Sequence, residues 1–243
     1  MCNFLSVILI ITLMMGVIPA AAQDKEQSRL EEAGTVLQEI VGMPEGLSSN
    51  LLDKAECVVV LPSVKKFAIG LGGSYGRGAM SCRSGDQFTG PWSAPVMMAL
   101  EGGSYGLQIG GEATDFVLLF MNPRAATAIL KNKVKLGITA SAAAGPKGRG
   151  ASADTDASLR AEILTYSRSR GLFAGISLEG STLRSDASAN QKIYGRRISP
   201  RRLIQQPGPG VSKDAALMVG TLNRISPKNE SNPDSLKTAP SRQ

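Results

Sequence analysis

The chain has 243 residues, of which 42% are hydrophobic and 19% are charged, and its formal net charge is +7 at pH 7. A chain of this length buries a hydrophobic core without metal or disulfide staples. It contains no histidine, which excludes Ser-His and Cys-His nucleophiles and removes the commonest zinc ligand.

The first 22 residues differ in composition from the rest. The run from Phe4 to Ile18 is almost entirely apolar and is followed by Pro19 and Ala20–Ala22, which is typical of a signal peptide with a small-residue cleavage site. We therefore expect an exported protein that is periplasmic, envelope-associated or secreted. The alternative is a membrane anchor through residues 4–18, although a span needs about 20 residues.

Charge divides the remaining chain into two regions. Residues 23–194 hold 18 basic and 17 acidic side chains, whereas residues 195–243 hold 9 and 3. The second region also contains Pro-Gly-Pro-Gly at 207–210, which does not sustain regular structure. The sequence predicts one domain over residues 23–195 and a basic, proline-rich, largely disordered tail over 196–243, with room for a weak helix from Lys213 to Leu222.

Apolar residues at helical spacing predict a helix over residues 24–41. Leu37 and Ile40 lie on its apolar face, and its polar face carries five acidic and two basic side chains. A helix that lies on an anionic membrane is usually rich in Lys and Arg, so docking on the protein's own core is favoured. A shorter second helix is expected over residues 48–55.

Glycine is concentrated in the next part of the chain. The heptapeptide Gly72–Gly78 is echoed thirty residues later from Gly102, and twelve glycines lie between Gly70 and Gly111. Glycine weakens the interior of a strand, so this density indicates bulges, bends or close backbone approach in a curved sheet. Phosphate binding is the alternative, but the chain lacks both glycine-loop nucleotide motifs.

Other apolar or alternating runs complete the predicted sheet. Strands are expected over residues 57–61, 95–100, 115–121, 161–168 and 172–178, and Pro62 should end the first of them. Asn122 and Pro123 predict a short helix to about Leu130, as a cap residue followed by proline. The expected class is α+β: a mostly antiparallel, glycine-rich curved sheet, barrel-like or sandwich-like, with N-terminal helices and one short internal helix.

A further strand is expected from Lys131 to Ala140, where the apolar period returns to two. Lys131, Lys133 and Lys135 would lie on one face, about 6.6–7 Å apart. The other, core-facing side would carry Val134, Leu136 and Ile138. This ridge of lysines is either a solvated strand face or an anion-binding surface.

Two cysteines and four carboxylates are the candidates for chemical sites. Cys57 and Cys82 lie in expected neighbouring strands, where export permits a disulfide but two buried thiols are equally familiar. The pairing stays open, and this spacing makes no zinc site. No spacing brings two carboxylates into one cleft, so no enzyme, metal or cofactor is expected; the candidates were Asp154, Asp156, Glu162 and Glu179.

Several runs of residues carry a resemblance to a known family. They are Gly70–Gly78, Trp92–Pro95, Gly106–Gly110, Asp115–Asn122 and Tyr166–Gly180, followed by Asn190 and Tyr194–Gly195. In this order, from about Leu30 to Gly195, they resemble the SYLF domain family. The resemblance implies a non-enzymatic lipid-binding module that binds phosphoinositides in animal members and actin in fungal ones. It also implies an N-terminal amphipathic helix used on membranes.

These observations predict a module that binds anionic phospholipid at a membrane surface. The candidate lipid contacts are Lys131, Lys133, Lys135, Lys65 and Lys66. The alternative is a structural or protein-interaction module of the cell envelope, for which export disfavours actin as the ligand. A protein partner is allowed for, and no nucleic acid is expected.

Overall fold

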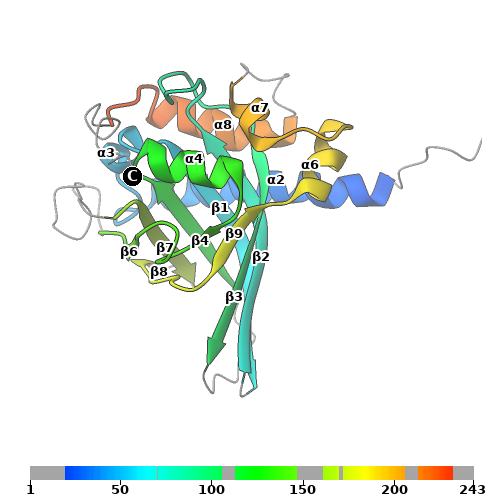
Figure 1. Cartoon of the computed structure of the whole chain (residues 1–243). Helices are drawn as coiled ribbons and strands as arrows, with labels where there is room; N and C mark the ends of the chain where they lie inside the picture. Colours follow the sequence, from blue (N-terminus) through cyan, green and yellow to red (C-terminus); the bar gives the residue numbers. More distant parts are fainter. Residues whose placement is uncertain are drawn as a thin grey trace, which may run out of the picture.

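The computed structural model describes residues 20–69, 71–105, 113–146, 161–169, 172–205 and 213–231. Its centre is a nine-stranded sheet in the order β5-β9-β3-β2-β1-β4-β7-β6, with β8 paired to β7. The strand pairs are antiparallel except for β6 with β7. The sheet curls, helices gather around its upper part, and β2 and β3 extend below it (Figure 1). The predicted α+β class is confirmed.

Nine strands and six helices make up the described part of the chain. The strands are β1 Cys57–Ile69, β2 Leu71–Cys82, β3 Val96–Tyr105, β4 Ala113–Phe120, β5 Val134–Lys135, β6 Ala142–Ala144, β7 Ile163–Ser169, β8 Leu172–Gly175 and β9 Thr182–Ser185. The helices are α2 Ala20–Gly42, α3 Ser49–Asp53, α4 Pro123–Lys131, α6 Ala187–Tyr194, α7 Pro200–Gln205 and α8 Lys213–Ile225.

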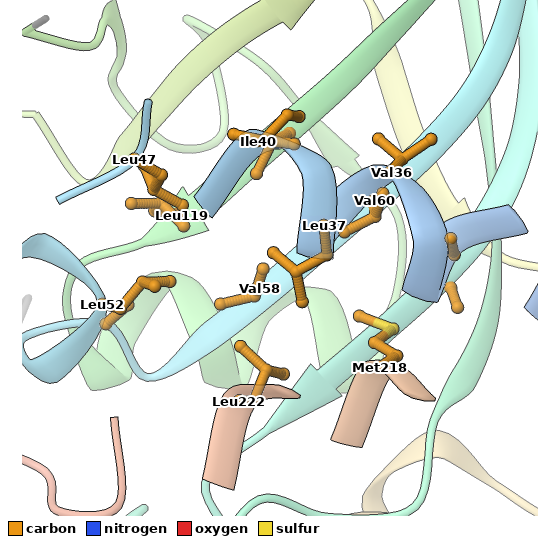
Figure 2. Packing of buried hydrophobic residues seen from close by; sticks show 14 of the residues in the cluster. Val36, Leu37, Ile40, Leu47, Leu52, Val58, Val60, Leu119, Met218 and Leu222 are labelled. Carbon is orange, nitrogen blue, oxygen red and sulfur yellow. The ribbon is translucent and has the colours of Figure 1, made fainter. Parts of the chain in front are cut away.

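The sheet is the middle layer between two hydrophobic clusters. Val58 and Val60 of β1 belong to the cluster of α2 and α8 (Figure 2), whereas Val59 and Leu61 belong to the cluster of α4 and α7. Successive side chains of a strand point to opposite faces, so each cluster takes alternate residues. Every side chain from Cys57 to Leu61 is fully buried, as the unbroken apolar run predicts.

Helix α2 docks on the sheet by one apolar face. Leu30, Leu37 and Ile40 are fully buried; Leu37 lies between the sheet and α8, and Ile40 lies over the sheet beside Leu119 (Figure 2). The outward side of the helix is acidic, with Glu31, Glu32 and Glu39 exposed. The expectation that this helix belongs to the protein's own core is confirmed.

Strand β1 continues past Pro62, where the sequence predicted its end. The pairing register with β4 shifts between Leu61 and Val64, and Ser63 has a φ of 50°. The backbone N–H of Ser63 donates to Oδ1 of Asp115 at 2.9 Å. A bulge therefore absorbs the proline and bends the strand without ending it.

Two glycines of β2 sit against this bulge. A Cβ on Gly78 would lie 2.0 Å from the carbonyl oxygen of Val60, and a Cβ on Gly76 would lie 2.4 Å from Cγ2 of Val64. Any larger residue would push β1 and β2 apart. The prediction that glycine marks bulges and close backbone approach is therefore confirmed.

Cys57 and Cys82 form a disulfide between β1 and β2. The two residues are directly opposite in the register of the pair, with an S–S distance of 2.01 Å and a Cα–Cα distance of 3.9 Å. The sequence left this pairing open because only the strand register brings the two sulfur atoms together.

The chain beyond residue 195 is part of the fold, which corrects the expectation of a largely disordered tail. Helix α8 packs against α2, and Met218 and Leu222 enter the same cluster as Leu37 (Figure 2). The composition of residues 196–210 suggested disorder, but the apolar face of α8 recurs at helical spacing. That face consists of Ala215, Met218, Val219 and Leu222. Residues 206–212 and 232–243 lie outside the described part of the chain.

Arg83 fastens the last described residues to the sheet. Its guanidinium donates to the carbonyl oxygens of Ser226 and Lys228 at 2.8 and 2.6 Å, and it stacks 4.1 Å from the ring centroid of Trp92. Trp92 Nε1 donates to the same Ser226 oxygen at 2.8 Å. Burial lowers the pKa of Arg83 to about 10, so this anchor keeps its charge at neutral pH.

A buried ion cluster joins α2, β2 and α6. Glu26 is 2% exposed and lies 3.4 Å from Nζ of Lys192 and 3.9 Å from Nη1 of Arg77, and it also pairs with Arg29. Nε of Arg77 lies 3.3 Å from Oδ2 of Asp186. The carboxylates are thus compensated where they leave water.

Asp186 also caps α6, because its Oδ1 accepts from the backbone N–H of Ala189 at 3.1 Å. Burial alone would raise the pKa of this carboxyl. The hydrogen bonds from Ser188 and Ala189 and the charges of Arg77 and Arg184 outweigh burial and hold the pKa below its usual value. The charged form is therefore favoured in the folded state.

Truncation tests the role of the C-terminal helices. A chain that ends after Gly195 loses α7, α8 and the Arg83 anchor, and it exposes the apolar face of α2. We expect its free energy of unfolding to fall by at least about 5 kcal/mol, since several buried apolar side chains lose their partners. Urea unfolding followed by circular dichroism measures this. A chain that ends after Ser231 should unfold like the full chain, and equal stability of both truncated chains would contradict the packing of α8.

The pH dependence of stability tests Asp186. The pKa of Asp186 is lower in the folded state than in the unfolded state. Its contribution to the free energy of unfolding is therefore fully present above the unfolded pKa of about 4, and it is lost as the pH falls through the folded pKa. Asp186→Asn keeps a capping side chain but should cost about 1–2 kcal/mol at pH 7. The difference from wild type should shrink below about pH 4 in urea titrations. Asp86→Asn, which makes the same substitution at an exposed carboxylate, is the matched control and should leave the free energy of unfolding at pH 7 nearly unchanged.

Candidate anion-binding site

The three lysines of the expected ridge lie together, but not on one strand. Lys131 is the last residue of α4, Lys133 lies in the connection that follows, and Lys135 ends the two-residue strand β5. All three side chains are exposed. The predicted strand from 131 to 140 is therefore wrong, because α4 continues through Lys131 and leaves only Val134–Lys135 to pair with β9.

The rest of the expected strand is a tight turn. Gly137 has a φ of 78°, and its N–H donates to the carbonyl oxygen of Ala140 at 2.9 Å. Val134 and Leu136 are buried as expected, but Ile138 is 71% exposed. The assignment of Ile138 to the core was wrong because the chain reverses at a left-handed glycine, after which the alternation of a strand no longer holds.

Lys65 and Lys66 lie elsewhere. Both belong to β1, and three strands, β9, β3 and β2, separate β1 from β5. Lys65 is exposed and is paired in register with Tyr75 and Ala113. The side chain of Lys66 lies outside the described part of the structure. The structure therefore does not bring these two lysines to the other three.

An open groove lies where α4 ends beside β9 and the segment after α6. We call it the basic groove; its volume is about 370 Å³. Its basic side chains are Lys131, Lys133 and Arg184, and apolar side chains including Ile129 and Ile198 contribute to its wall. Its other lining residues are Leu130, Asn132, Ser185, Ala187, Ser199 and Pro200.

The lysines of the groove are available to a ligand. In the part of the chain that the structure describes, Lys131, Lys133 and Lys135 form no ion pair with a carboxylate. Arg184 is held by Glu101, with Nε 3.1 Å from Oε1, and this hydrogen bond raises the pKa of the guanidinium. Among the described residues, the groove therefore presents two lysines without a carboxylate partner and one oriented guanidinium.

The arginines of this region join the groove through tertiary structure that the sequence does not reveal. Arg184 reaches the groove only because β9 pairs with β5, where its neighbours Leu183 and Thr182 lie opposite Val134 and Lys135. Four exposed arginines flank the groove-lining segment 198–200: Arg196, Arg197, Arg201 and Arg202. The sequence predicted that these positive charges belong to a largely disordered tail over residues 196–243. The apolar residues Leu203 and Ile204, which are buried, were the signal that this segment folds back.

The outer surface of α2 has the opposite charge. A second open groove, of about 360 Å³, runs between α2 and the β1 bulge and is lined by Glu31, Glu32, Glu39 and Asp115. Arg168 bridges Glu39 and Asp115 there, with Nη2 2.7 Å from Oδ2 of Asp115. We call this surface the acidic groove. It would repel an anionic membrane.

The remaining chemistry is sparse in the described part of the chain. No group of three or more His, Cys, Asp or Glu side chains is placed there to hold a metal ion, and no described helix combines the length and apolar character that a membrane span requires. Glu162 pairs with Arg124 at 2.5 Å, and Glu179 is exposed. Asp154 and Asp156 lie outside the described residues.

Comparison with known proteins gives consistent matches. A family model described as Ysc84, Las17-binding protein actin regulator, matches residues 101–225. An SH3 domain-containing protein of Schizosaccharomyces pombe is 37% identical over 188 residues, which cover 73% of this chain and 43% of that protein. The human SH3 domain-containing YSC84-like protein 1 is 31% identical over 198 residues, covering 77% and 56%.

The fungal relatives include LAS seventeen-binding protein 3 of Saccharomyces cerevisiae, 30% identical over 196 residues that cover 78% of this chain and 42% of that protein. The family description and the name of this relative refer to binding and regulation, and none of the four names is that of an enzyme. The chain spans roughly half the length of these relatives. The family match ends at the last residue of α8, so α7 and α8 fall within it. The chain belongs to the SYLF domain family, the family of Ysc84.

Proposed function

We propose that the protein binds anionic phospholipid at a membrane surface, without catalysis, through the basic groove. The observation that carries this proposal is the set of Lys131, Lys133 and Arg184 around one open groove, with the two lysines unpaired among the described carboxylates. Lys and Arg are the side chains that bind phosphate, Arg through its fork of donors and Lys as a point charge.

The size and lining of the groove support a headgroup as its ligand. Its volume of about 370 Å³ lies in the range of about 300–1,000 Å³ that is typical of small-molecule sites. Asn132, Ser185 and Ser199 add polar groups beside the cations. A phosphate could pair with the cations, while the polar side chains bind the hydroxyls of the headgroup.

The position of α2 supports contact through the groove and not through the helix. Leu37 and Ile40 are fully buried against the sheet, so a membrane could reach them only if the helix undocked, at a cost of several kcal/mol. The face that α2 leaves free is acidic. Each Lys or Arg near an anionic membrane contributes about 1 kcal/mol to the binding free energy. The basic groove supplies such side chains, whereas the free face of α2 does not.

Protein interaction is the second candidate. The family is described by Las17 binding and actin regulation, and one relative is named for binding Las17. The acidic groove, with its four carboxylates and one arginine, suits a basic partner. A chain that ignores anionic vesicles but captures such a partner through the acidic groove would favour this candidate.

We also propose that the chain is exported. The disulfide between Cys57 and Cys82 supports this, because such bonds persist in oxidising compartments and are rare in the cytosol. The apolar run and small-residue site of residues 4–22 support it independently.

Thiol labelling tests export. In protein recovered from an exporting cell, Cys57 and Cys82 should resist alkylation after unfolding without reductant, and the chain should begin after residue 22 by mass spectrometry. Reduction should then lower the free energy of unfolding by about 3 kcal/mol, since the bond closes a loop of 25 residues. An intact N-terminus together with two alkylated cysteines would contradict the proposal.

Charge removal tests the lipid site. Replacing Lys131, Lys133 and Lys135 by Gln in the full chain should weaken binding to anionic vesicles roughly 100-fold, because three contributions of about 1 kcal/mol each are lost. The loss should shrink in high salt as screening increases. Vesicle co-sedimentation measures it, with binding to zwitterionic vesicles as the reference.

A charge-matched control separates the groove from net charge. Gln at three other lysines lowers the total charge equally but leaves the groove intact; these lysines are Lys25, Lys213 and Lys228, all exposed. This control should bind nearly as tightly as the wild type. Equal losses in both triple variants would mean that net charge, and not the groove, governs binding.

A further inference from the structure

Ile138 presents a large apolar side chain to solvent at the tip of a turn. It is 71% exposed, whereas the neighbouring apolar residues Val134 and Leu136 are fully buried. A single exposed isoleucine is unremarkable by itself. What distinguishes this one is that hydrogen bonds hold the turn and that its neighbouring lysines have no carboxylate partner among the described residues.

Hydrogen bonds close the turn and tie it to the sheet. The backbone N–H groups of Ile138 and Thr139 both donate to the carbonyl oxygen of Lys135, at 3.1 and 2.7 Å. On the other side, the N–H of Leu136 donates to the carbonyl oxygen of Ser181 at 2.9 Å, and the N–H of Gly180 donates to the carbonyl oxygen of Leu136 at 2.9 Å. The turn therefore holds Ile138 outward instead of letting it collapse onto the surface.

The lysines next to the turn share its exposed side. Lys133 and Lys135 alternate with the buried Val134 and Leu136, so their side chains point away from the core. Lys133 lines the basic groove. At about 3.3 Å per residue, the extended chain from Lys133 to Leu136 spans about 10 Å, which keeps the groove and the turn within one contact area.

One carboxylate accompanies these lysines. A Cβ on Gly137 would lie 2.9 Å from Cγ of Glu179, so the exposed Glu179 packs against the turn. Against it stand Lys131, Lys133 and Lys135, and the local charge stays positive. The arrangement is an apolar tip within a basic surface, the combination that favours the interface of an anionic membrane.

We infer that the Ile138 turn inserts into the interfacial layer of the membrane while the basic groove holds a lipid headgroup. This inference rests on the proposed lipid-binding function and adds the element that penetrates. The lysines supply salt-dependent attraction, and Ile138 supplies a salt-independent hydrophobic contribution because its apolar surface leaves water. The rigid turn lets the side chain enter without ordering a flexible loop.

The chain offers a matched control in Leu172. This side chain is 78% exposed at the start of β8 and is paired with Ser169. It lies near Arg168, which binds Glu39 and Asp115 in the acidic groove. Insertion there would bring carboxylates to anionic lipid, so Leu172 should stay in water.

Vesicle binding of serine variants is the first experiment. In the full chain, Ile138→Ser should weaken binding to anionic vesicles roughly tenfold, and the factor should be the same at low and high salt. Leu172→Ser should leave binding unchanged. Both residues are exposed, so both variants should unfold at the wild-type temperature, which thermal melts check.

Tryptophan quenching is the second experiment. It reports whether residue 138 enters the bilayer, independently of the other contacts that hold the protein on the vesicle. The only native tryptophan, Trp92, is buried, so the wild type gives a constant background. Ile138→Trp should be quenched by vesicles whose acyl chains carry bromine, and its emission should shift to the blue. Leu172→Trp should show neither change.

The outcomes separate this inference from the function on which it rests. If the wild type binds vesicles but Ile138→Ser binds equally well, or the tryptophan of Ile138→Trp is unquenched, insertion is overturned and a purely electrostatic contact at the groove remains. A loss in Ile138→Ser that disappears in high salt also overturns it. If the wild type binds no anionic vesicle, the lipid function and the inference both fail.

Discussion

Strand β1 carries apolar side chains on both faces, so each face of the sheet must be covered before the strand is stable. Val58 and Val60 need α2 and α8, whereas Val59 and Leu61 need α4 and α7. The two helical layers follow from this requirement. So does the position of the candidate site, because α4 belongs to the cluster that covers Val59 and Leu61, and its last residue, Lys131, lines the groove together with Arg184 and Ser185 of β9. The basic groove thus results from the way α4 and α7 cover the face of the sheet that carries Val59 and Leu61.

Local signals in the sequence were sufficient for most elements. Asn122 accepts from the N–H of Ala125 at 2.9 Å, as a cap should, and the unbroken apolar run at Cys57–Leu61 is buried on both faces. The failures came where a local pattern was ambiguous. The alternation after Lys131 fitted a strand equally well until Gly137 reversed the chain, and the arginines after Tyr194 hid the buried Leu203 and Ile204. Tertiary packing determines the conformation of both segments, and composition alone does not reveal it.

The candidate site was only half accessible to sequence reasoning. Three lysines were found because they lie within five residues of one another, but Arg184 joins them through the β5–β9 pairing, which has no signature in either segment. Asn190 is similar. Its Oδ1 accepts from the N–H of Met97 at 2.8 Å and its Nδ2 donates to the same residue's carbonyl oxygen at 3.1 Å. The side chain thus makes the hydrogen bonds that a neighbouring strand would make and fixes α6 to β3, so Asn190, one of the residues that carry the family resemblance, has a structural role.

The packing of α2 against α8 also sets the order in which this protein can fold. Met218 completes the cluster around Leu37, and the carbonyl oxygen of Ser226 accepts from Arg83. These contacts join residues far apart in the sequence, and such contacts form slowly during folding. A chain made from its N-terminus cannot bury α2 fully until α8, Lys213–Ile225, has been synthesised. The apolar face of α2 therefore stays exposed until that point of synthesis.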